Sequence, residues 1–177
     1  MGMFTPKQLY AAIRSAETDM LDTKQWGNNR WRRTSANTTP NGSTAYGPVQ
    51  ITMTRVSDYL NPKVTKKKFS DKEIKGYADK FKIQSDLYNI HGNEKKMKGY
   101  DSRLGYSNKS DPTSGVGMLT SKEDKENYIK MAEKMIADTY SDTGGDIDKF
   151  IKSWRSETEA KDPSYYKKVK AYLKANP

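Results

Sequence analysis

At residues 5–17 the sequence reads TPKQLYAAIRSAE, and this stretch carries the signals of a helix start followed by an amphipathic helix. Thr5 is suited to cap the first free amides, Pro6 fits the first helical position, and Gln8 can complete a capping box. The sequence therefore predicts a helix that begins here and runs to about Glu17.

The apolar face of this predicted helix ends in a carboxylate. Leu9, Ile13 and Glu17 stand at positions i, i+4 and i+8, so the glutamate continues the stripe that faces the core. A carboxyl beside apolar side chains keeps its proton more readily, because burial disfavours the charged form. Glu17 is therefore a candidate proton donor.

The remaining patterns predict further helices. Apolar stripes and caps place them near 54–60, 70–89, 121–140, 147–154 and 162–176, with a short strand or tight turn at 46–52. Ser70 with Glu73 is the expected capping box of the 70–89 helix, and Ser121 with Asp124 caps the helix from 121. The fold class expected is mainly α, with a very small β element.

Length and composition limit the possibilities further. The 177 residues suit a single domain over 1–177, with a core over about 5–154 and a C-terminal helix at 162–176. Cysteine is absent and His91 is the only histidine, which excludes disulfides, a cysteine nucleophile and a multi-histidine metal site. Neither a calcium loop nor a phosphate-binding loop is found. We expect no metal and no cofactor.

The chain is strongly basic, with a formal charge of +10 and lysine clusters at 66–68 and 95–96. Basic proteins are attracted to nucleic acid, anionic lipid and acidic wall polymers, and charge alone does not choose among them. A solvated lysine-rich surface is the plainer interpretation. No apolar run is long enough for a membrane span, and the N-terminus lacks the apolar region of a secretory signal.

A second motif follows at residues 45–52, which read AYGPVQIT. With the glutamate that ends the first helix, this segment resembles the lysozyme-like superfamily, specifically the soluble lytic transglycosylases and their phage virion relatives. In that family a Gly-x-x-Gln segment lines the wall of the sugar cleft opposite the glutamate, and Gly47 and Gln50 match its spacing. A later Ala-Tyr-Asn element is similar to the segment around Tyr140. The sequence departs from the pattern at Thr18, where serine is common, and at residues 48–49, where Pro-Val replaces Leu-Met.

The resemblance implies a site and a fold. It implies a lysozyme-like helical domain in which Glu17 is the catalytic residue and Gln50 hydrogen-bonds a sugar, while Gly47 lets the backbone approach the ring. For Tyr140, an aromatic residue of the core is the competing interpretation. The full set of residues expected to bind substrate is Gln50, Gly47, Tyr46, Tyr140, Trp31 and Tyr106; for Trp31 and Tyr106, stacking on sugars competes with ordinary packing.

The distribution of acidic residues favours one reaction. Most glycosidases use two carboxylates, yet no acidic residue occurs between Asp22 and Asp58, and Asp19 would point to another helix face than Glu17. A single carboxyl suits a lytic transglycosylase, which cleaves the bond between muramic acid and glucosamine units without consuming water. A muramidase that uses Asp19 or Asp22 to position water is the alternative on the same fold.

Two other classes stay open. One is a catalytically inactive virion or wall-binding module. The other is a nucleic-acid-binding protein that uses the basic and aromatic residues 30–33, although we do not expect nucleic acid to be the specific ligand. The expected partners are peptidoglycan glycan strands and other virion tail proteins. The expected location is a phage tail or internal core acting in the host periplasm and wall, or, for an endolysin, the host cytoplasm until lysis.

Overall fold

The computed structural model describes residues 3–20, 26, 47–89, 121–156 and 158–177. The helices in this part of the chain are α1 (Pro6–Thr18), α3 (Met53–Leu60), α4 (Lys72–Asn89), α6 (Lys122–Asp142), α7 (Ile147–Arg155) and α8 (Pro163–Ala175). Over the same residues, extended structure is limited to a bridge at Ile51. The prediction of a mainly α chain is therefore confirmed.

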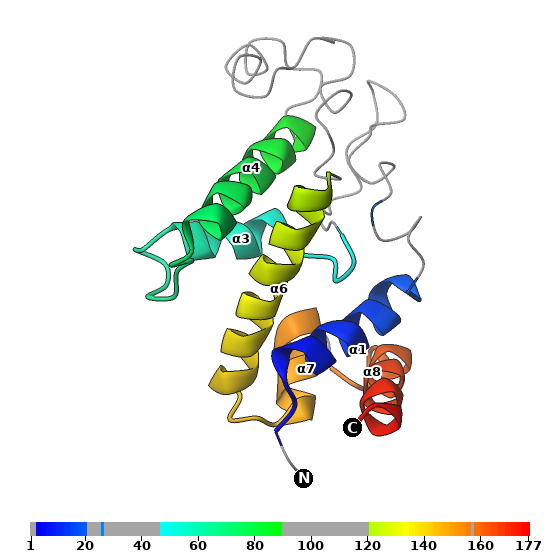
Figure 1. The fold of residues 1–177 in the computed structure, drawn as a ribbon. Coiled ribbons are helices and arrows are strands. Elements are labelled where there is room, and N and C mark those ends of the chain that lie inside the picture. Colours follow the sequence, from blue (N-terminus) through cyan, green and yellow to red (C-terminus); the bar gives the residue numbers. More distant parts are fainter. Residues whose placement is uncertain (1–2, 21–25, 27–46, 90–120, 157) are drawn as a thin grey trace.

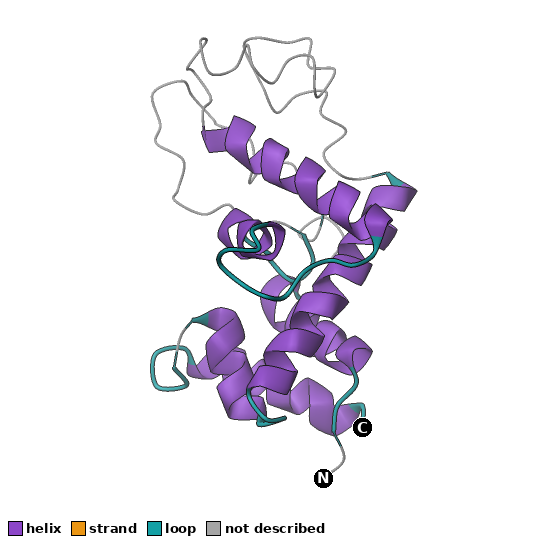
Figure 2. Ribbon diagram, turned by 90° about the vertical axis from the view of Figure 1, so that its left-hand side faces the viewer, coloured by secondary structure: helices purple, strands orange, loops and turns teal. Residues whose placement is uncertain are grey.

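The helices form two groups along a long central helix. Helix α6 runs through the middle of the molecule, with α3 and α4 on one side of it and α1, α7 and α8 on the other (Figure 1). Helix α1 packs against both α6 and α8, and α4 packs against both α3 and α6. Figure 2 shows the same two groups from the side. Within the described residues, no helix is long and apolar enough to cross a membrane.

Helix α1 forms as its sequence predicts. Gln8 N donates to Thr5 Oγ1 at 3.2 Å, and Thr5 N donates to Gln8 Oε1 at 2.8 Å, which completes the capping box. Leu9 and Ile13 are buried in the core. The helix ends at a left-handed residue, Asp19, with φ 50°.

The cap predicted for α4 is wrong by one residue. Asp71 Oδ1, and not the Ser70 hydroxyl, accepts from Glu73 N at 2.9 Å and from Ile74 N at 3.0 Å. The reason is the position of the first turn, because a capping side chain has to stand directly before the first helical residue, here Lys72. When Ser and Asp are adjacent, the sequence does not determine which of them stands directly before the first helical residue.

The later helices begin and end at residues with the expected chemistry. Ser121 caps α6 by accepting from Asp124 N at 3.1 Å, and Asp162 caps α8 by accepting from Tyr165 N at 3.3 Å. Helix α6 ends two residues later than predicted and is followed by Gly144 and Gly145, both with positive φ. Side chains of α8 lie in the same buried cluster as those of α1, namely Tyr165, Tyr166, Val169 and Leu173.

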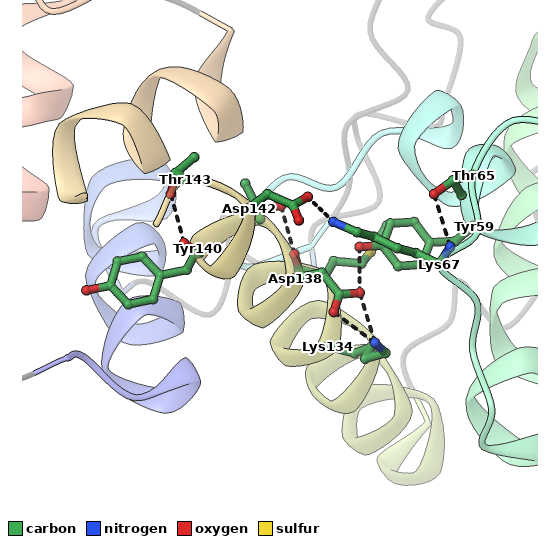
Figure 3. A network of polar contacts seen from close by, with 10 residues as sticks. Tyr59, Thr65, Lys67, Lys134, Asp138, Tyr140, Asp142 and Thr143 are labelled. Atoms are coloured by element: carbon green, nitrogen blue, oxygen red, sulfur yellow. Dashed lines mark hydrogen bonds and ion pairs between the residues drawn. The ribbon is translucent and has the colours of Figure 1, made fainter. Parts of the chain in front are cut away.

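A polar seam joins α3 and the connector after it to α6 (Figure 3). The Tyr59 hydroxyl donates to Asp138 Oδ2 at 2.9 Å, and Lys134 Nζ donates to both oxygens of Asp138 at 2.9 Å. Lys67 pairs with Asp142 one turn further along α6. The seam fixes α3 against the central helix.

Candidate active site at the junction of α1, α3, α7 and α8

A polar cavity of about 510 Å³ lies where the end of α1 meets the turn at 47–50, α3 and the α7–α8 junction. Its volume falls within the range of about 300–1,000 Å³ that is usual for ligand sites. The residues that line it are Ala16, Glu17, Gln50, Thr52, Arg55, Trp154, Arg155, Ser156, Asp162, Ser164, Tyr165 and Lys168. Most of them are polar or charged, which suits a ligand rich in hydroxyl and amide groups.

The turn at 47–50 is fixed by its packing against Tyr128 of α6. Gly47 has φ +81°, and a Cβ at this position would overlap the ring of Tyr128. Gln50 N donates to Gly47 O at 3.1 Å and closes the turn, while Val49 N donates to the Tyr128 hydroxyl at 3.3 Å. Glycine is therefore required here by the conformation of the chain and by contact with Tyr128.

A buried hydroxyl connects this turn to the end of α1. Thr18 Oγ1 lies 3.0 Å from Arg14 O and 3.2 Å from Pro48 O, so its single proton is shared between the helix and the turn. Thr18 is 2% exposed. This hydroxyl, which serine would also supply, sets the position of the turn relative to Glu17.

Gln50 is held in an uncommon conformation. Its φ is 53°, in the left-handed region, where a residue with a Cβ is strained by about 1–2 kcal/mol. The side-chain nitrogen Nε2 donates to Gly47 O at 2.9 Å, which fixes the amide plane. Among the described residues Oε1 has no donor, so this oxygen is left to accept a hydrogen bond from a ligand.

Glu17 also lines the cavity and is largely shielded, with its side chain 11% exposed. Its surroundings differ from the apolar pocket that the helix pattern predicts. Arg155 Nη1 lies 3.7 Å from Glu17 Oε1, which is an ion pair without a short hydrogen bond. The apolar stripe of α1 ends at Ala16 and Glu17, where α7 and α8 bring polar groups that the sequence of α1 cannot specify.

The Tyr165 hydroxyl is the second polar group near Glu17. It is buried and, within the described residues, has no hydrogen-bond partner of good geometry. Burial, followed by the charge and proximity of Glu17, raises the pKa of Tyr165 far above its ordinary value. Tyr165 is thus a neutral hydroxyl directed towards the carboxyl group.

Arg155 bridges the two carboxylates of the cavity. Arg155 Nε donates to Asp162 Oδ2 at 3.2 Å, closer than its contact with Glu17. Although burial lowers the pKa of Arg155, the charge of Glu17 and the hydrogen bond to Asp162 outweigh it, and the pKa is raised. Both oxygens of Asp162 are engaged, since Oδ1 accepts from Tyr165 N.

The structure brings together only part of the predicted site. Glu17 and Gln50 line one cavity, and Gly47 forms the same turn but lies against Tyr128. Tyr140 does not line the cavity; it is buried with its ring edge-on to Phe150 at 5.6 Å. Tyr46, Trp31 and Tyr106 lie outside the described residues.

Sequence reasoning did not find several residues of the cavity wall. These are Thr52, Arg55, Trp154, Arg155, Asp162, Tyr165 and Lys168. The sequence predicts a helix at 162–176, but no local pattern shows that α8 packs along α1. These residues reach the cavity through contacts between helices distant in sequence, which a local sequence pattern does not predict.

A scan against protein-family models finds no match to this chain, and searches of curated proteins and of solved structures find none either. A function for the chain therefore has to be argued from the chemistry of the cavity. The groups available there are a shielded carboxyl, a neutral tyrosine hydroxyl, a fixed amide oxygen and two guanidinium groups.

Proposed function

We propose that this chain is a peptidoglycan lytic transglycosylase with Glu17 as its catalytic acid and base. One observation carries the proposal: Glu17 at the end of α1 and Gln50 in the turn at 47–50, distant in sequence, line the same polar cavity. This is the pairing that the resemblance implies for the two walls of a sugar cleft.

The reaction needs one carboxyl group. Glu17 donates its proton to the oxygen of the bond between muramic acid and glucosamine, and that bond breaks. The carboxylate then takes the proton from the C6 hydroxyl of the muramic acid, whose oxygen forms a new bond to its own anomeric carbon. No water is consumed, and the product carries an anhydro-muramyl end.

The second carboxylate of the cavity favours this reaction over hydrolysis. A hydrolase needs a base or nucleophile beside the acid. Asp162 is engaged through both oxygens, by Arg155 and by the first turn of α8. Asp19 does not line the cavity and pairs with Lys168 at 3.0 Å. The muramidase alternative would depend on Asp22, which lies outside the described residues.

Gln50 and Tyr165 have supporting roles in the proposal. The free amide oxygen of Gln50 accepts from a sugar acetamido group and so orients the ring. The Tyr165 hydroxyl donates to the Glu17 carboxylate after proton transfer, which stabilises the charge that develops there. Arg155 stabilises the same charge in the free protein, so substrate binding has to weaken this ion pair before Glu17 can act as an acid.

The deciding experiment is mass spectrometry of purified peptidoglycan after digestion. We expect muropeptides lighter by one water than hydrolytic products with the natural chain and none with Glu17→Gln. Glu126→Gln, on an exposed face of α6, is the matched control and should digest normally. Hydrolytic products would favour the muramidase, and binding without digestion would favour the inactive module.

For the biological setting, we favour a phage particle that carries this chain and uses it to open the wall during genome entry. An endolysin released at lysis is the alternative. Comparison of purified particles with infected-cell lysates, by immunoblot, separates the two.

A further inference from the structure

Arg55 on α3 presents a fixed guanidinium group at the cavity wall. Its Nη2 donates to Trp154 O at 2.8 Å and to Ser153 O at 3.3 Å, and its central carbon lies 4.2 Å from the centre of the Trp154 ring. One edge and one face of the guanidinium are thus held by α7. The remaining donors, Nε and Nη1, make no hydrogen bond within the described residues.

The charges around the cavity leave Arg55 without a carboxylate partner. Arg155 pairs with Glu17 and Asp162, and Lys168 pairs with Asp19. Within the described part of the chain, no carboxylate lies at ion-pair distance from Arg55.

Burial lowers the pKa of Arg55, despite opposing effects from Tyr59, Tyr165 and the carboxylate of Asp58. A partly buried guanidinium without a carboxylate at ion-pair distance retains the capacity to pair with an anion. An anionic group of a ligand would supply both the counter-charge and the acceptors.

We propose that Arg55 binds a carboxylate borne by the muramic acid unit of the substrate. The inference rests on the proposed function and adds a substrate preference to it. Two sources can supply this carboxylate: the lactyl group of a muramic acid that has lost its stem peptide, or the stem peptide itself. A carboxylate oxygen can accept a charge-assisted hydrogen bond from Nη1 or from Nε while Nη2 stays bonded to α7. The lactyl carboxylate is the source that we favour, because it is attached directly to the sugar ring that enters the Glu17 cavity.

The test compares three substrates: glycan strands freed of stem peptides, the same strands with their carboxyls converted to methylamides, and peptide-bearing strands. The natural chain should cleave the peptide-free strands with a kcat/KM about 10- to 100-fold above that for the amidated strands, as expected for a hydrogen-bonded charge pair. Arg55→Gln should bring this ratio close to one. Peptide-bearing strands as the preferred substrate would identify the stem peptide as the source.

The ratio separates binding from a structural role. If Arg55 only holds α7, its loss slows cleavage of both strands equally and leaves the ratio unchanged, which overturns the inference. A ratio near one in the natural chain overturns it as well. Lys168→Gln, which removes a cavity cation already paired with Asp19, is the matched control and should keep the ratio. If Arg55→Gln does not fold, Arg55→Lys, which keeps the charge but not the planar guanidinium held by α7, should give an intermediate ratio.

A binding measurement distinguishes this inference from the proposed function. Short peptide-free and amidated strands are titrated into the Glu17→Gln chain and into the chain that also carries Arg55→Gln. Tighter binding of the carboxylate strand that depends on Arg55 supports the inference even if no strand is cleaved. Equal binding of the two strands to both chains rejects it, whatever the natural chain cleaves.

Discussion

Two carboxylates of this molecule have neighbours of the same kinds and are bonded very differently. Asp138, in the seam between α3 and α6, accepts from the Tyr59 hydroxyl and from Lys134, all at 2.9 Å (Figure 3). Burial, followed by the hydrogen bond to Asp138, raises the pKa of Tyr59 far above its ordinary value. This carboxylate is saturated by short bonds and holds two helices together.

Glu17 also lies beside a tyrosine and a cation. Its distance to Arg155 is 3.7 Å, and the Tyr165 hydroxyl makes no hydrogen bond of good geometry within the described residues. The contact between Arg155 and Glu17 is longer than the contacts of Asp138, and a cavity lies next to it. We therefore expect the first carboxylate to contribute mainly to stability and, under the proposed function, the second to exchange a proton with a ligand.

The largest expected effects come from substituting the two carboxylates themselves, which tests the comparison directly. Glu17→Gln should lower kcat on peptidoglycan by about 10²–10⁴-fold, because a positioned acid or base contributes about that much, and should leave the melting temperature nearly unchanged. Asp138→Asn should do the opposite: activity is retained, and the free energy of unfolding falls by about 1–2 kcal/mol, allowing for the partial exposure of Lys134. Turbidity clearing of purified wall and thermal denaturation measure the two quantities. Loss of stability without loss of activity in Glu17→Gln would contradict the comparison.

The next effect concerns the turn that carries Gln50. Gly47→Ala should lower the free energy of unfolding by about 2–5 kcal/mol, since left-handed strain and overlap with the Tyr128 ring add together. Gly144→Ala has the same left-handed conformation and no atom within 4 Å of the added Cβ, so it should lose only about 1–2 kcal/mol. Chemical denaturation of the pair checks this, and equal losses would show that Tyr128 moves aside.

A smaller effect concerns the charge on Glu17. Removing Arg155 by Arg155→Gln takes away a positive charge that stabilises the carboxylate, so Glu17 keeps its proton to higher pH. If the protonated form starts the reaction, the alkaline limb of the kcat/KM profile moves to higher pH. Lys168→Gln should shift this limb less, because Lys168 pairs with Asp19. A shift to lower pH would reject the role of Glu17 as an acid.

The last effect compares the two tyrosines. Tyr59→Phe removes a hydrogen bond at 2.9 Å to a charged acceptor and should lower the free energy of unfolding by about 1.5–3 kcal/mol at most. Tyr165→Phe removes a buried hydroxyl without a partner of good geometry, and its effect on stability should be within about 0.5 kcal/mol. Denaturant titration of both variants decides the matter, and a large loss for Tyr165→Phe would show that its hydroxyl is bonded after all.

The sequence predicted more of the helices than of the site. The cap at Thr5 and the stripe of Leu9 and Ile13 are local features, and both are confirmed. The cap of α4 was assigned to Ser70 because neighbouring polar residues differ little in capping ability. Of the site, only Glu17 and Gln50 were predicted among the residues that line the cavity.

Side-chain periodicity and capping are properties of a few consecutive residues, so the amino-acid order by itself determined the mainly helical class and placed a carboxyl at the end of the first helix. The tertiary structure alone decided that α8 lies along α1 and that Arg55, Arg155 and Tyr165 reach the same cavity as Glu17. The physical reason is distance along the chain. A charged side chain on a helix more than a hundred residues away is not visible in the local sequence pattern. It nevertheless determines whether a buried carboxyl group lies beside apolar carbon or beside a guanidinium group.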